Sequence, residues 1–267
     1  MERRAETDRL AGLGVVRVTA HNPGPMTLTG SNSWLLGDDQ PVLVDPGPDL
    51  PEHAAAVALA LDQRGGPSAI VLTHAHADHA GALDELRARY PAAPVYAAAT
   101  RLGARPLADE ERIGPLRAVA TAGHSADHFA FVGAGVCFTG DAVLGEGSVF
   151  VAPGENSLAR YLAALARIAE IPELAVICPG HGPAVFEPRA KLLEYIDHRL
   201  ARERRLVAAL DAGLRTTDDL LDSAWSDAPA VLRPAAAVTL AAHLEKLDGE
   251  ARLPDGVERQ QFELGDW

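Results

Sequence analysis

The stretch from Thr73 to His79 reads T-H-A-H-A-D-H and contains three histidines and one aspartate. It follows the apolar run 69–72, which is typical of a buried strand. It precedes residues 80–90, where apolar side chains recur at helical spacing and predict a helix. The polar stretch is therefore expected in the turn between a buried strand and a helix.

The spacing within this stretch suits metal binding. Residues two apart at the end of an extended strand point the same way, so His74 and His76 can share one ion. Asp78 and His79 follow at the turn into the helix and can reach a second ion. Imidazole and carboxylate ligands fit a borderline cation such as Zn²⁺. Taken alone, the same residues could also form a solvated loop, so the prediction depends on further clusters in the chain.

Three further strand-like segments lead into a histidine or an aspartate. They are 116–120 with His124, 136–139 with Asp141, and 174–178 with His181, the last within P-G-H-G-P. A lone histidine in a loop usually has no function, and an aspartate after a strand often caps a turn. Four such strand ends in succession instead predict one convergent metal centre.

Two more residues are candidates for supporting roles. Asp45 ends a predicted strand, 42–45, just before Pro46-Gly47, and could accept the free N–H of a ligating histidine. A simple turn aspartate before proline is the alternative. His128 could line the pocket or support a ligand, or it could be an ordinary surface residue.

Length and composition limit the class of protein. A chain of 267 residues can form one large domain, or a medium and a small one. With 48% apolar and 23% charged residues the composition is globular, and no apolar stretch approaches the ~20 residues needed to span a membrane. A charged start without an apolar signal core, and two cysteines in apolar runs, predict a cytoplasmic protein. The formal charge of −13 argues against a broad nucleic-acid-binding surface.

The series of motifs resembles the metallo-β-lactamase superfamily over roughly residues 12–185: T-H-x-H-x-D-H, then G-H-S, then G-D after a strand, then P-G-H-G. The resemblance implies an α+β fold, the αββα sandwich of two sheets flanked by helices. It also implies two Zn²⁺ ions per chain, with Mn or Fe as alternatives. By resemblance His74, His76 and His124 hold the first zinc, Asp78, His79 and His181 hold the second, and Asp141 bridges them.

Within the superfamily, the chain is most similar to the lactamase-β-2-like group, a relative of glyoxalase II. The similarity lies in residues 22–34, 123–128 and 140–145. The commonest true metallo-β-lactamases have a cysteine where this chain has Asp141, which disfavours antibiotic hydrolysis.

The composition changes in the tail. Helices are expected over 192–210, 217–225 and 233–247, followed by a hairpin of two short strands, 250–253 and 257–264. This pattern suggests a small C-terminal winged-helix-like domain, with a catalytic domain over 1–188 and the appendage over 189–267. The charges around the third helix cancel, so we expect the appendage to pack against the catalytic domain or line its entrance. The arginines of its first helix could steer an anionic substrate.

The expected activity is that of a binuclear zinc-dependent hydrolase, in which a metal-bridging hydroxide attacks the substrate and Asp78 or Asp141 carries a proton. The preferred substrate is a small-molecule ester or thioester. Two alternatives are a single-strand endoribonuclease, with single-stranded RNA as its substrate, and a non-enzymatic winged-helix regulator that binds nucleic acid. No membrane association is expected, and the sequence leaves open whether the chain forms a homo-oligomer.

Overall fold

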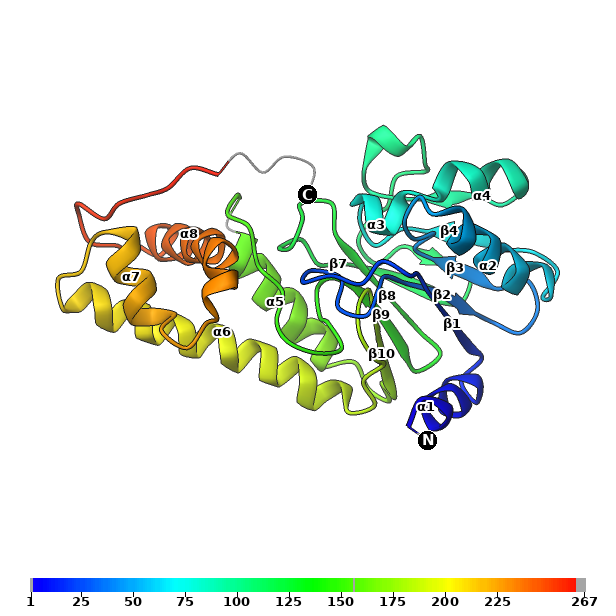
Figure 1. Cartoon of the computed structure of the whole chain (residues 1–267), viewed down its shortest axis with the longest axis horizontal. Helices are drawn as coiled ribbons and strands as arrows, with labels where there is room; N and C mark the ends of the chain where they lie inside the picture. The colour runs from blue at the N-terminus through cyan, green and yellow to red at the C-terminus, as the bar shows by residue number, and fades with distance from the viewer. Residues whose placement is uncertain (1, 156, 263–267) are drawn as a thin grey trace.

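In the computed structural model, residues 2–155 and 157–262 are described, and these form two five-stranded sheets with helices on their outer faces (Figure 1). The first sheet has the order β1 (Val15–Thr19), β2 (Asn32–Leu36), β3 (Val42–Val44), β4 (Ala69–Val71), β5 (Val95–Tyr96). The second has the order β10 (Val176–Pro179), β9 (Val136–Gly140), β8 (Phe129–Gly133), β7 (Leu116–Ala120), β6 (Arg112–Ile113). Both sheets are mixed: β3, β4 and β5 run parallel, as do β9 and β10, and the other neighbours are antiparallel.

The alternation of side chains along the strands explains the layers. In β3, Val42 and Val44 face the core between the two sheets, while Leu43 belongs to the core on the outer side of the first sheet. Between the sheets, Trp34 lies against Phe138, with ring centroids 6.3 Å apart. A strand buried on both faces typically has a continuous apolar sequence, as β3 (V-L-V) does. The expected α+β sandwich of two sheets flanked by helices is confirmed.

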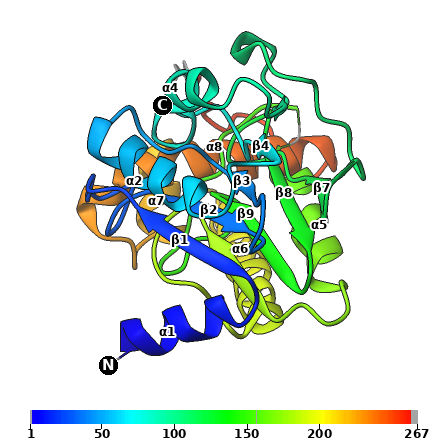
Figure 2. The same cartoon turned by 90° about the vertical axis from the view of Figure 1, so that its right-hand side faces the viewer.

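Helices cover each outer face. The first sheet carries α2 (Pro51–Asp62), α3 (Ala77–Ala80) and α4 (Leu83–Arg89), and the second carries α5 (Ser157–Ala169) together with parts of the tail. A short 3₁₀ helix, η1, spans Thr100–Leu102. The N-terminal helix α1 (Glu2–Ala11), which the sequence analysis did not predict, lies beside β1 below the sheets (Figure 2).

The helix expected over 80–90 is broken into α3 and α4. The break occurs because the N–H of Ala82 donates to the carbonyl of Gly47, 2.9 Å away, instead of to an acceptor in its own helix. The N–H of Gly47 in turn donates to the carbonyl of His79 at 2.8 Å. These two bonds hold the loop after β3 against the segment that carries the histidines.

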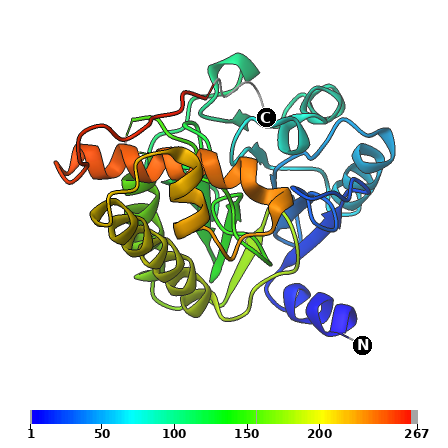
Figure 3. The same cartoon turned by 60° about the vertical axis from the view of Figure 1, so that its left-hand side comes forward.

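The tail consists of α6 (Pro188–Asp211), α7 (Thr217–Ala224), the 3₁₀ helix η2 (Ala230–Leu232) and α8 (Arg233–Gly249), which group together beside the sandwich (Figure 3). The first half of α6 packs on the second sheet through Leu192 and Tyr195, and its second half joins the tail's own core through Leu206 and Leu210. The domain boundary at 188/189 therefore falls at the start of a helix shared by both cores, and it stays a prediction.

The predicted wing is wrong for the residues that can be judged. Described residues 250–262 contain no strand, and residues 263–264 of the second predicted strand lie outside the described residues. The segment instead lies against the tail helices: Leu253 and Val257 pack on the tail core, and the N–H of Glu258 donates to the carbonyl of Arg215 at 2.8 Å. The segment after α8 therefore packs on the tail helices, and its two halves do not pair with each other as a hairpin. Among the described residues, no helix is both long and apolar enough to cross a membrane.

Candidate metal centre

The predicted ligands lie where strand ends of the two sheets meet. In the first sheet, β4 leads into the H-A-H-A-D-H stretch, and the short helix α3 carries Asp78 and His79. In the second sheet, β7, β9 and β10 lead to His124, Asp141 and His181. The structure thereby brings all seven predicted ligands together, in three overlapping groups whose ligand atoms lie within 4.8 Å of one another.

His74, His76 and His124 form the first group. Nε2 of His74 lies 3.0 Å from Nδ1 of His76, and Nε2 of His124 lies 3.2 Å from the same atom. Burial lowers the pKa of all three imidazoles, that of His124 to about 4, so they are neutral at physiological pH. Neutral imidazoles whose nitrogens face one point are the donor set that a divalent cation binds.

Asp78, His79 and His181 form the second group. Oδ2 of Asp78 lies 3.2 Å from Nε2 of His181 and 3.6 Å from Nε2 of His79. Burial alone would lower the pKa of both imidazoles, but the neighbouring carboxylates, Asp141 foremost, raise the pKa of His181 to about 9 and that of His79 well above its ordinary value. The carboxylates therefore stabilise positive charge beside His79 and His181, and either a proton or a metal cation can supply that charge.

Asp141 lies between the two groups. Its Oδ1 is 3.4 Å from Nε2 of His79 and 3.4 Å from Nε2 of His181, while its Oδ2 is 3.6 Å from Nε2 of His124. Burial would raise the pKa of Asp141, but the imidazoles of His79 and His181 hold it well below its usual range. Each oxygen of the ionised carboxylate thus faces a different group, which is the arrangement that the predicted bridging role requires.

Two atoms of the site test directly whether the residues fit a metal. Nε2 of His79 and Oδ1 of Asp141 are buried and have no hydrogen-bond partner among the described residues. Buried polar atoms without partners are rare because each costs about 1–3 kcal/mol. A cation bound between these atoms would remove that cost, so the residues fit a metal centre.

Asp45 occupies the supporting position expected from its sequence. Its Oδ2 accepts a hydrogen bond from Nδ1 of His79 at 2.9 Å and another from the hydroxyl of Thr73 at 2.8 Å. Its Oδ1 accepts the N–H of Thr73 at 2.7 Å. The hydroxyl of Thr73 also lies 3.0 Å from Nδ1 of His74. One buried carboxylate therefore orients the imidazoles of two predicted ligands, His79 directly and His74 through Thr73.

His128 is buried rather than on the surface. Its Nε2 accepts the backbone N–H of Asp141 at 3.1 Å, so its proton is on Nδ1, which lies 2.7 Å from the hydroxyl of Thr121. The ring also stacks on His74, with centroids 4.9 Å apart. His128 thus holds the loop that carries Asp141.

The loop before β2 supplies two contacts that the sequence analysis did not assign. The hydroxyl of Ser31 donates to Oδ2 of Asp78 at 3.0 Å, and the carbonyl of Gly30 lies 3.4 Å from Nδ1 of His181. Asn22 holds Ser31 in place through its side-chain oxygen and nitrogen. The only signal for this in the sequence was the similarity of residues 22–34 to the lactamase-β-2-like group.

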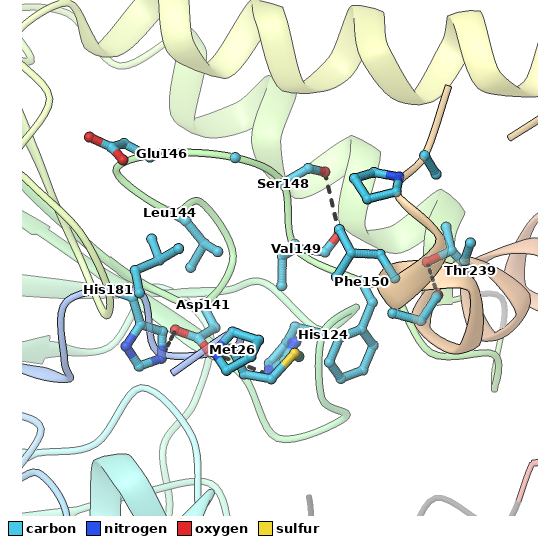
Figure 4. Close-up of a pocket in the computed structure, with 18 of the residues that line it drawn as sticks. Met26, His124, Asp141, Leu144, Glu146, Ser148, Val149, Phe150, His181 and Thr239 are labelled. Atoms are coloured by element: carbon cyan, nitrogen blue, oxygen red, sulfur yellow. Dashed lines mark hydrogen bonds and ion pairs between the residues drawn. The ribbon is translucent and has the colours of Figure 1, made fainter. Parts of the chain in front are cut away.

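A cavity of about 540 Å³ opens above the metal centre and extends to the helical tail (Figure 4). At its inner end Phe150 lies against His124, with ring centroids 4.9 Å apart, and Thr239 of α8 lies on the other side. Arg199 and Arg202 of α6, which were expected to steer an anionic substrate, do reach the cavity. Both are buried, however: Arg199 donates to Ser148 and Val149, and Arg202 pairs with Asp227.

Comparisons with known proteins agree with the site. The model of the metallo-β-lactamase superfamily matches residues 26–112. A beta-lactamase-like protein 2 homolog of Caenorhabditis elegans is 32% identical over 95% of this chain and 89% of its own length. A thioesterase of Emericella nidulans is 35% identical over 73% of this chain, which spans 58% of that longer protein.

A solved structure described as a di-iron-bound form is 32% identical, covers 65% of this chain and 96% of its own, and superposes with a TM-score of 0.51. Proteins of this superfamily normally bind divalent metals such as zinc or iron, and the His and Asp groups described above could hold them. The fold, the seven converging side chains and the near full-length similarity to curated relatives together show that the chain belongs to the metallo-β-lactamase superfamily of hydrolases.

Proposed function

We propose that this protein is a binuclear metal-dependent hydrolase that cleaves an ester or thioester, with zinc as the cation that best suits its ligands. The observation that carries the proposal is the position of Asp141, whose two oxygens face the two histidine groups at 3.4 and 3.6 Å. The di-iron form of the 32% identical structure supports a metal pair and keeps iron as an alternative.

Each of the two histidine groups would bind one metal ion. His74, His76 and His124 would hold one ion, and Asp78, His79 and His181 the other, with Asp141 shared. A metal pair of this kind supplies a water activated at neutral pH and polarises the bond that is attacked. The side chain of Asp78 is 28% exposed and that of Asp141 only 10%, so Asp78 is the carboxylate better able to pass a proton to the cavity.

The lining of the cavity favours an ester or thioester over RNA. Sites for single-stranded nucleic acid combine a positively charged groove with aromatic side chains. Among the described residues that line this cavity, Arg199 and Arg202 are the arginines, no lysine is present, and both guanidinium groups are already hydrogen-bonded within the protein. The name of the Emericella nidulans relative, a thioesterase, points the same way.

A substrate panel tests the proposal. The zinc-loaded protein should hydrolyse a chromogenic thioester and leave single-stranded RNA and a phosphodiester intact. Hydrolysis of RNA with no thioester turnover would favour the endoribonuclease alternative and contradict the proposal. Tight binding of duplex DNA with turnover of none would favour a regulator.

A further inference from the structure

The cavity joins two parts of the chain that are distant in sequence. One side consists of the metal ligands His76, His124 and His181, and the other of residues of the helical tail. We call the apolar tail side the tail wall and define it as Trp225, Leu232, Ala235 and Ala236. A substrate held at the metal centre can therefore extend directly along the tail wall.

The tail also fixes the loop that forms the roof of the cavity, residues 144–154. From α6, the hydroxyl of Tyr195 accepts the N–H of Leu144 at 3.0 Å and donates to the carbonyl of Gly147 at 3.0 Å. From α8, a carboxylate oxygen of Glu245 accepts the N–H of Gly154 at 2.8 Å. Contacts at both ends of the loop make the cavity a preformed space rather than a gap between loosely joined parts.

Two polar side chains beside the tail wall, Thr239 and Asp227, are already engaged within the protein. The hydroxyl of Thr239 donates to the carbonyl of Ala235 at 3.1 Å, and its oxygen lies 3.4 Å from the N–H of Val151. The carboxylate of Asp227 pairs with Arg202 and with Arg205. The tail wall itself offers apolar surface, to which the half-buried ring of Phe150 and the exposed Met26 contribute at the metal end. The exposed side chains of Glu146 and His198 also line the cavity.

We propose that the tail wall binds an apolar acyl arm of medium size, and that Ala235 on α8 limits its length. This inference rests on the proposed thioester or ester hydrolysis. The acyl side fits better than the thiol side because biological thiol carriers bear phosphate and amide groups, which need cations or hydrogen-bond partners. Pockets that bind small molecules typically have volumes of roughly 300–1,000 Å³, and the volume of this cavity, about 540 Å³, lies in that range.

The substitution that tests the inference is Ala235→Leu, which adds three carbons to the tail wall. Ala235 is only half-buried, and leucine has a high helix propensity, so the variant should fold. Ala241→Leu is the matched control, because Ala241 is half-buried on the same helix and does not line the cavity. Acetyl, hexanoyl and decanoyl thioesters of N-acetylcysteamine are compared, together with acetyl thioesters of longer alkyl thiols.

Ala235→Leu should lower kcat/KM for the decanoyl substrate by about tenfold, change the acetyl substrate less than about twofold, and leave the response to thiol length unchanged. Ala241→Leu should match the wild type with every substrate. Equal losses for acetyl and decanoyl substrates, or losses that follow thiol length, would overturn the inference while leaving the hydrolase proposal in place.

A binding measurement separates the two proposals if no thioester is hydrolysed. Decanol is titrated into the wild-type protein, and the emission of Trp225 reports occupancy, with Trp225→Phe identifying its signal. Failure of the fully zinc-loaded protein on all thioesters would contradict the proposed function. Decanol binding weakened about tenfold by Ala235→Leu would still support an apolar-arm site on the tail wall, whereas unchanged binding would overturn it.

Discussion

Asp45 accepts a hydrogen bond from Nδ1 of His79 at 2.9 Å, and both side chains are almost completely buried. Because Nδ1 of His79 donates a hydrogen bond to Asp45, Nε2 is the ring nitrogen that faces Asp141 and the candidate metal centre. The two residues come from different parts of the chain: Asp45 directly follows β3, and His79 lies in the helix α3. The bond therefore fixes the orientation of the His79 ring relative to the segment that follows β3.

Asp45→Asn should weaken metal binding by about 10–100-fold, because an amide cannot hold the imidazole of His79 and the hydroxyl of Thr73 as the carboxylate does. Metal affinity is measured by competition with a chromophoric chelator. Asp84→Asn, at a fully exposed side chain of α4, is the control and should bind like the wild type. Equal affinities in the wild type and Asp45→Asn would show that the contact does not orient His79.

Asp141→Ala should abolish turnover and lower the metal content, because the carboxylate faces both histidine groups. Ser125→Thr keeps the hydroxyl that donates to Asp127 at 2.8 Å and should leave the rate almost unchanged. Turnover and bound metal are measured on the same samples. Normal activity in Asp141→Ala would refute the bridging role.

Metal affinity should rise with pH. The pKa of His181 is raised to about 9 by its carboxylate neighbours against the effect of burial, so a proton must leave this ring before the ring can bind a cation. Affinity is therefore lowest in acid and increases from about pH 6 toward about pH 9. Chelator competition over this range measures it, and affinity that does not vary with pH would mean that His181 is not a ligand.

Gly180→Ala should weaken metal binding and also destabilise the fold. A Cβ at this position would lie 2.4 Å from Oδ1 of Asp141 and 2.6 Å from Cε1 of His79, so a ligand must move. Gly12→Ala, where the nearest atom would be 3.4 Å away, is the control. We expect about tenfold weaker metal binding, measured by chelator competition. We also expect a loss of about 1–3 kcal/mol in the free energy of unfolding, measured by urea denaturation. Unaltered metal binding would place Asp141 elsewhere.

Much of this arrangement was predictable because local patterns specify it. Strand β7 has the predicted bounds, and the strand-end residues His124, Asp141 and His181 meet as their position in the pattern indicated. These residues converge because β7, β9 and β10 run in the same direction, so their carboxyl ends lie at one edge of the second sheet.

What the sequence did not reveal depends on contacts between distant residues. The bond from Ser31 to Asp78 joins positions 47 residues apart, and no local pattern encodes it. The break between α3 and α4 depends on a carbonyl of Gly47 that competes for the N–H of Ala82. The predicted wing failed for a similar reason, since Leu253 and Val257 find apolar partners on the tail helices. Helix α1 is strongly charged and carries no apolar stripe that periodicity could detect.

The measurement that tests the central claim most directly is the transition-metal content of the purified protein, determined by elemental analysis after reconstitution with zinc and removal of free ions. The account predicts about two ions per chain in the wild type and about one or fewer in Asp141→Ala, because the carboxylate of Asp141 faces both histidine groups. A wild-type protein that retains no stoichiometric metal under these conditions would contradict it.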